Sequence, residues 1–91
     1  MLDIRRSSQF KKDLKKILKQ HEDLETLEFL ITSLQAQKKL PAKYRDHALI
    51  GDWKNYRECH VLPDWLLIYK VDHDLQLLKL MRTGSHSELF G

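Results

Sequence analysis

Apolar residues recur with two different periods along this chain. In the first 40 residues they return every three or four positions, which is the period of an amphipathic α-helix. This spacing predicts one helix over residues 8–20, capped by the hydroxyl of Ser7 or Ser8. A second helix is predicted to begin at Asp23 and to end before Pro41, which cannot continue a helix. The link between them is short, so we expect the two helices to form a hairpin.

Alternating apolar and polar positions, typical of β-strands, occur at the N-terminus and in the last third of the chain. Residues 2–6 predict a short strand. Tight turns, one of them at Pro63-Asp64, separate three later segments, so we expect an antiparallel meander. The helices would cover one face of this sheet, which gives a single α+β domain over residues 1–91. The three later segments are residues 56–62, 65–71 and 75–82, and a long polar connection over residues 41–55 precedes them.

Charge is distributed unevenly, although the formal net charge is only +3. Residues 1–20 and 38–57 are rich in lysine and arginine, whereas residues 21–37 contain acids but neither lysine nor arginine. Basic blocks suit a polyanion such as RNA, but they are equally compatible with a solvated helix face. The chain has one cysteine, no apolar run long enough to span a bilayer and no signal-peptide core. We therefore expect a cytoplasmic protein without an internal disulfide or membrane contact.

The predicted meander brings charged groups from distant parts of the sequence to one end of the sheet. His60 ends one strand where Asp64 and Trp65 begin the next. Arg82 ends the last strand beside that same start, because consecutive antiparallel strands run in opposite directions. His86 follows four residues after Arg82, so it should lie near the same end.

These residue types fit cleavage of RNA without a metal. A base takes the proton of the ribose 2′-OH, the oxygen attacks the adjacent phosphorus, and an acid protonates the leaving 5′-oxygen, which yields a 2′,3′-cyclic phosphate and a 5′-OH. An arginine stabilises the developing charge, and an aromatic ring can stack on a base. Simpler roles exist: Trp65 could pack in the core, and Asp64 could merely start the turn. His21 and His73 fall outside the cluster and are natural controls.

Several short motifs resemble the YafQ-like branch of the RelE/ParE superfamily of bacterial type II toxins. The motifs are Asp46-His47, Gly51-Asp-Trp53, Tyr56-Arg57, His60-Val61, Pro63-Asp64-Trp65, Ile68-Tyr69-Lys70, Arg82-Thr83-Gly84-Ser-His86 and Leu89-Phe90. The resemblance implies a RelE-like fold and ribosome-dependent cleavage of mRNA in the A site, without a metal or other cofactor. It also implies a cognate antitoxin, typically of the ribbon-helix-helix type, that neutralises the toxin.

The resemblance also assigns roles to individual residues. His86 is implied to be the general acid, and Arg82 to neutralise the scissile phosphate. The base and the orientation of the RNA are implied to come from His47, His60 and Asp64, and which of the three takes the proton stays open. Trp65 and Phe90 are implied to shape or stack the codon, and the basic face of the first helix is expected to meet ribosomal RNA or an acidic antitoxin segment through Lys11, Lys15 and Lys19.

Two other classes of function stay open at this point. Three histidines and an aspartate could bind zinc and form a metal-dependent hydrolase, although their spacing matches no compact zinc motif. A toxin of this superfamily could also act without catalysis, by binding a protein target as gyrase-directed relatives do. Those relatives lack the histidine and aspartate cluster, so its presence favours the nuclease.

Overall fold

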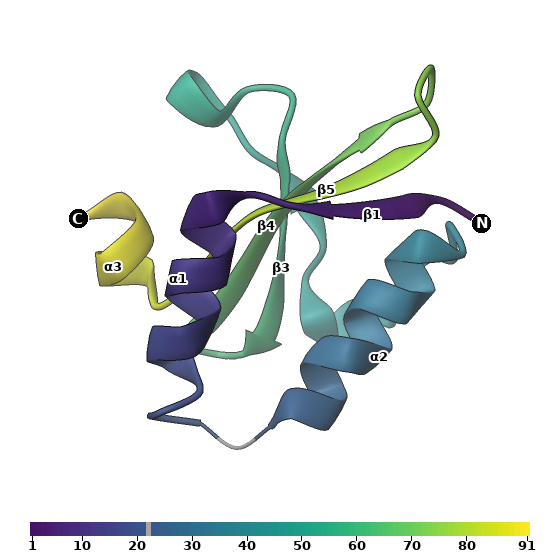
Figure 1. Cartoon of the computed structure of the whole chain (residues 1–91). Coiled ribbons are helices and arrows are strands. Elements are labelled where there is room, and N and C mark those ends of the chain that lie inside the picture. The colour runs from purple at the N-terminus through teal and green to yellow at the C-terminus, as the bar shows by residue number, and fades with distance from the viewer. Residues whose placement is uncertain (22) are drawn as a thin grey trace.

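The chain folds as the α+β domain that the pattern predicts, and the computed structural model describes residues 1–21 and 23–91 (Figure 1). No helix among them is long and apolar enough to cross a membrane. The elements follow the order β1 (Asp3–Arg6), α1 (Ser8–Ile17), α2 (Leu24–Gln35), η1 (Ala42–Tyr44), β2 (His47–Ala48), η2 (Gly51–Trp53), β3 (Arg57–Leu62), β4 (Trp65–Asp72), β5 (Leu77–Gly84) and α3 (His86–Phe90).

The five strands form one sheet in the order β1-β5-β4-β3-β2. The predicted meander of β3, β4 and β5 is confirmed, since both pairs are antiparallel. β1 lies parallel to β5 in the sheet. Parallel neighbours need a long connection, and here the two helices and the other strands lie between β1 and β5 in the sequence. β2 lies inside the long polar connection over residues 41–55, where the sequence pattern predicts no strand, and it pairs antiparallel with the start of β3. The additional strand extends the sheet beyond β3.

Both helices begin where the sequence predicts, α2 ends before Pro41 as expected, and α1 ends earlier than predicted. The Ser7 hydroxyl accepts the backbone N–H of Phe10 and caps α1, which stops at Ile17 instead of residue 20. α2 stops at Gln35, well before Pro41, because Gln37 adopts a left-handed conformation with a φ of 56°. The end of α1 was overestimated because Leu18 continues the apolar period into a turn that also faces the core.

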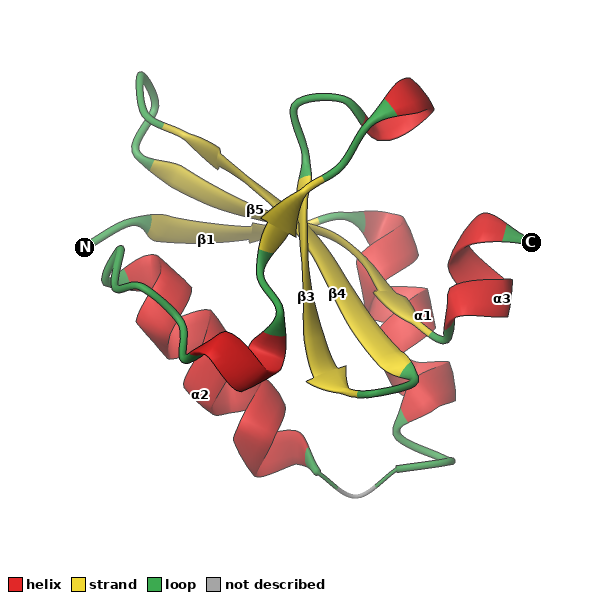
Figure 2. Ribbon diagram, turned by 180° about the vertical axis from the view of Figure 1, so that it is seen from behind, coloured by secondary structure: helices red, strands yellow, loops and turns green. Residues whose placement is uncertain are grey.

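The two helices cover the same face of the sheet but diverge from their link instead of lying parallel (Figure 1). A groove of about 400 Å³ lies between them and over β1. Figure 2 shows the same arrangement from behind, with a short helical turn, η1, between α2 and β3. The two helices are therefore held together mainly by the sheet on which both of them pack.

The central strand β4 separates two apolar clusters. Trp65, Leu67 and Tyr69 point toward α1 and α2 and are almost completely buried. Leu66 and Ile68 point to the other face, where residues of the β2–β3 connection and of α3 cover them. We call this second side the open face. Because successive residues of a strand point to opposite sides, β3 and β4 can hold the main core on one face and present other chemistry on the other.

Candidate active site

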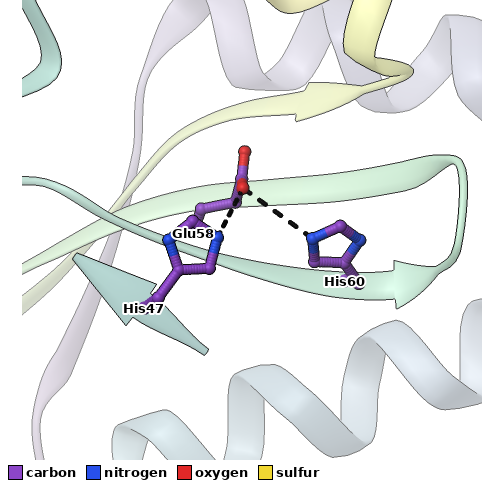
Figure 3. Close-up of side chains that lie close together, drawn as sticks. All are labelled: His47, Glu58 and His60. Atoms are coloured by element: carbon purple, nitrogen blue, oxygen red, sulfur yellow. Dashed lines mark ion pairs between the residues drawn. The ribbon is translucent and has the colours of Figure 1, made fainter. Parts of the chain in front are cut away.

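Three ionisable side chains lie together on the open face at the junction of β2 and β3 (Figure 3). In the sheet register His47 lies opposite Glu58, Glu58 lies opposite Ile68, and His60 lies opposite Leu66. Directly opposed residues in antiparallel strands share a face. The cluster of His47, Glu58 and His60 therefore lies beside the smaller apolar cluster and not in the main core.

Glu58 is the centre of this cluster. Its Oε2 lies 2.9 Å from Nε2 of His47 and 3.8 Å from Nε2 of His60, while its side chain is only 5% exposed. The other carboxylate oxygen and the Nδ1 atom of His60 are buried and have no hydrogen-bond partner among the described residues. Buried polar atoms are usually paired, and exceptions concentrate where function needs them. The cluster thus contains two buried polar atoms without a partner in the described part of the chain, which marks it as a candidate functional site.

Glu58 was missed in the sequence, although one signal was present. It stands two positions before His60, so an alternating strand puts both on one face. A carboxylate next to a histidine on a strand face orients the imidazole and stabilises its protonated form. What the sequence could not show was the third member, because His47 reaches the pair only through β2.

His47 is held in place through the hydrogen bonds of its neighbour in the sequence, Asp46. Asp46 accepts hydrogen bonds from the Tyr69 hydroxyl and from Nε of Arg57, which lies 3.3 Å away. Burial, followed by the bond to Asp46, raises the pKa of Tyr69 above its ordinary value, so the hydroxyl stays a donor. Tyr69 is fixed in the core, and its bond to Asp46 therefore ties the start of β2 to the central strand.

Arg82 is held by a residue of α1 that no sequence pattern singles out. Its Nε and Nη2 atoms donate to the two carboxylate oxygens of Asp13 at 2.7 and 3.1 Å, and the backbone N–H of Thr83 donates to the same carboxylate. Burial raises the pKa of Asp13, but the hydrogen bonds from Arg82 and Gln9 outweigh it and leave the pKa lowered. The strand pairing of β1 with β5 ends at Leu80, and beyond that point α1 runs along β5. Asp13 of α1 can therefore reach Arg82.

α3 is fixed at its start and from its side. The Ser85 hydroxyl accepts from the backbone of Glu88, whose carboxylate accepts the Ser85 N–H, so the two form a capping box. The same carboxylate pairs with Lys16 of α1 at 2.8 Å. The hydrogen bond from Lys16, with that from Ser85, lowers the pKa of Glu88 to about 2. Gly84 precedes the helix with a φ of 154°, and a Cβ there would lie 3.3 Å from Glu88.

An aromatic row leads from this helix toward the β2–β3 connection. His86 is exposed and meets Phe90 edge-to-face, with ring centroids 5.1 Å apart. Phe90 is 41% exposed and meets Trp53 at 6.4 Å, and Trp53 in turn meets Tyr56 at 5.4 Å. Trp53 and Tyr56 pack on the apolar cluster of the open face. Phe90 therefore offers an accessible ring beside His86.

Trp65 packs in the core, the simpler role that the sequence left open, and its buried ring is not free to stack on RNA. Its side chain is fully buried, its Nε1 atom donates to Oγ1 of Thr83, and the ring of His21 lies 5.4 Å from it in a stacked arrangement. The meander does bring Trp65 to the same end of the sheet as Arg82, as expected, but it faces the helices. Position along a strand sets the end of the sheet, whereas the alternation of side chains sets the face. His21 is consequently a poor control, and His73, exposed in the opposite turn, is the better one.

The remaining sequence-predicted residues are exposed. Asp64 lies in the turn between β3 and β4, without an ion pair or side-chain hydrogen bond recorded in the described part of the chain. Three exposed lysines lie on α1 or just after its end, and their expected contact with RNA stays a prediction. They are Lys11, Lys15 and Lys19.

The donor set of the cluster also fits a metal ion. His47, Glu58 and His60 each offer one ligand atom, and these atoms lie within 4.8 Å of one another. Two imidazoles and a carboxylate are ligands that zinc accepts in catalytic sites with an open fourth position. The same three groups can therefore move protons or bind a cation, but a bound cation would take the lone pairs that proton transfer requires.

Comparison with known proteins connects this geometry to a toxin family. Residues 2–91 match a family model described as the bacterial toxin YafQ of type II toxin–antitoxin systems. The mRNA interferase toxin YafQ of Escherichia coli strain K12 is 49% identical over 90 residues, which span 98% of this chain and 96% of that protein. The toxin structure in the E. coli DinJ–YafQ complex is 48% identical with a TM-score of 0.88 and full coverage of both chains. A metal-bound toxin from Helicobacter pylori is 46% identical with a TM-score of 0.93, over 99% of this chain and all of that one.

Proposed function

The chain belongs to the YafQ family of bacterial toxins of type II toxin–antitoxin systems, and from this premise we propose that it is an mRNA interferase. In this proposal it is an endoribonuclease that cuts mRNA in the ribosomal A site and so inhibits translation. The activity named for the E. coli relative supports the proposal. Within the structure, one observation carries it: the cluster of His47, Glu58 and His60 on the open face, in which half-exposed His47 bonds to a buried carboxylate.

We assign each step of the reaction to a residue according to the exposure of its side chain. The His47 side chain is 50% exposed and bonds to buried Glu58, so it is best placed to take the proton of the ribose 2′-OH while Glu58 orients the ring. His60, only 17% exposed, supports Glu58 from the other side. His86, exposed on α3, protonates the leaving 5′-oxygen. Asp64 serves as an additional contact to the RNA near the same end of the sheet.

Charge and stacking complete the site. Arg82 neutralises the scissile phosphate, with its guanidinium held in orientation by Asp13. Phe90 stacks on a base of the codon, a role that its exposed ring permits and that buried Trp65 does not. The exposed lysines on α1 and just after its end would meet ribosomal RNA or an acidic segment of the antitoxin.

The test is cleavage of mRNA on translating ribosomes, read as new 5′ ends. We expect the wild-type chain to cut, and His47→Ala and His86→Ala each to lower the rate by about 100-fold or more, as general acid–base catalysts do. His73→Ala is the matched control and should cut normally. Growth arrest without new 5′ ends would instead indicate a non-enzymatic toxin that acts on a protein target.

The proposal includes a protein partner and a compartment. A relative in this family forms a complex with the antitoxin DinJ, which supports a cognate antitoxin for this chain, and we expect one of the ribbon-helix-helix type. Since ribosomes and mRNA are the proposed targets, the toxin would act in the cytoplasm. Co-expression with the neighbouring antitoxin gene should relieve growth arrest, and persistent arrest would argue against that partner.

The donor set supports metal binding as a second role, in competition with catalysis. One relative is described as a metal-bound toxin, and the three donors here fit zinc or copper. We expect added Zn²⁺ to slow cleavage and EDTA to restore it, because the metal occupies the groups that transfer protons. Loss of activity in EDTA, with recovery in zinc, would instead favour a metal-dependent hydrolase.

A further inference from the structure

A separate hollow adjoins the cluster at the outer edge of β3. β2 pairs with Arg57 and Glu58 alone, so the later part of β3 has no neighbouring strand on that side in the described structure. The η1 segment lies against this part of β3 and leaves a hollow of about 290 Å³ between them, beside the short helical turn seen between α2 and β3 in Figure 2. His60 forms part of one wall of the hollow.

The facing wall is positively charged. It contains Lys43, Tyr44 and Arg45, and both cations are exposed. Neither has an ion pair with any of the residues that the structure describes. The nearest acid in the sequence, Asp46, is already engaged by Tyr69 and Arg57. The wall thus keeps two cations without a recorded internal counter-charge.

An aromatic ring lies between these cations in the sequence. The Lys43 amine lies 5.1 Å from the centre of the Tyr44 ring, which is half-buried against Phe29. This cation–π contact favours a position of the lysine charge beside the hollow. Arg45 has a φ of 50°, and this left-handed conformation turns the chain from η1 toward β2. Charge, ring and hollow are therefore parts of one local structure.

We propose that this hollow is a subsite for the RNA strand, in which Lys43 and Arg45 bind the phosphate of the nucleotide next to the one that is cut. The inference rests on the proposed function. An RNA strand carries one charge per nucleotide, so a strand that places its reacting ribose at the cluster must place a neighbouring phosphate close by. The hollow shares His60 with the cluster and offers two donors to such a phosphate. Contacts of this kind fix the position of the strand without reading its sequence.

The experiment measures binding of a short RNA that carries 2′-O-methyl groups and cannot be cut, over a series of KCl concentrations. The test protein is the full chain with Lys43→Gln and Arg45→Asn. Asparagine tolerates the left-handed conformation at position 45, so the loop should keep its shape. The matched control is Lys38→Gln with Lys39→Gln, which removes the same charge from exposed positions outside the hollow.

We expect the test pair to weaken binding about tenfold at low salt and to reduce the slope of log affinity against log salt by about 0.7 for each phosphate that the protein no longer neutralises. The control pair should leave both nearly unchanged. Equal effects of the two pairs would overturn the subsite, and so would absence of RNA binding by the wild-type chain at low salt. Cleavage on ribosomes is measured separately with the wild-type protein. If the wild-type protein cuts mRNA but the test and control variants bind RNA equally well, the subsite is refuted while the proposed nuclease function stands.

Discussion

The two faces of the sheet use the same strands for opposite purposes. On the helix face, β4 contributes side chains that are buried with their polar atoms paired, as the bond from Trp65 to Thr83 illustrates. On the open face, β3 contributes Glu58 and His60, and each has a buried polar atom without a recorded protein partner. Unpaired buried polar atoms are costly, so the helix face contributes stability, whereas the cluster on the open face gives up some stability. Substitutions on the helix face should therefore mainly lower the free energy of unfolding, whereas substitutions on the open face should mainly lower the cleavage rate.

Trp65→Ala should cause the largest change in stability. Removing a fully buried tryptophan costs about 3–5 kcal/mol, a large part of the unfolding free energy of a domain this small. Urea denaturation followed by circular dichroism would measure it. Leu75→Ala is the control, since Leu75 is 63% exposed and should change stability by less than about 0.5 kcal/mol. A stable Trp65→Ala protein that cuts slowly would restore a direct role for Trp65 in catalysis.

Glu58→Gln should separate activity from stability on the open face. The substitution keeps the shape of the side chain but removes the charge that orients both histidines, so we expect cleavage to slow by about 100-fold. The free energy of unfolding should change by less than about 1.5 kcal/mol, because the buried carboxylate is incompletely paired. Single-turnover cleavage and urea denaturation of the same preparation give both values. An unchanged rate would reduce Glu58 to a structural residue.

Asp13→Asn tests how α1 serves the open face. Hydrogen bonds to charged groups contribute about 1.5–3 kcal/mol, so the free energy of unfolding should fall toward the lower end of that range. Cleavage should fall less than in Arg82→Ala, because the guanidinium remains. Thermal denaturation and the cleavage rate are the measurements, and Asp23→Asn, an exposed acid, is the control. Faster cleavage than wild type would mean that Asp13 masks Arg82 instead of positioning it.

The pH dependence of stability should give the smallest effect. The folded pKa of Glu88, about 2, lies below its ordinary value of 4.5, mainly because Lys16 bonds to it. A lowered folded pKa contributes stability that is complete above pH 4.5 and is lost as the pH falls toward 2. The lowered pKa of Asp13 acts in the same direction. Unfolding measured from about pH 6 to about pH 2.5 should therefore depend less on pH in Lys16→Met than in wild type, and identical curves would contradict the role of this ion pair.

Some of the site could be predicted because it depends only on strand order. A meander must bring the end of β3 and the end of β5 to the start of β4, and the register confirms this. The face of the sheet that each side chain occupies was harder to predict. Trp65 was expected to contact RNA, although it follows the apolar alternation of Leu67 and Tyr69 and lies with them in the core. β5 has one extra residue, Met81, between the partners of Ile68 and Tyr69, and this shift in register is not predicted by alternation alone.

The sequence by itself determined the two long helices, the meander and the family, because periodicity, turn chemistry and short motifs are local properties of the chain. Tertiary structure decided which side chains meet. His47 reaches Glu58 only through the pairing of β2 with β3, and Asp13 reaches Arg82 across 69 positions because α1 continues along β5 where β1 stops. Such pairings depend on how separate elements pack, and no local pattern encodes that packing. The site therefore exists only in the folded chain.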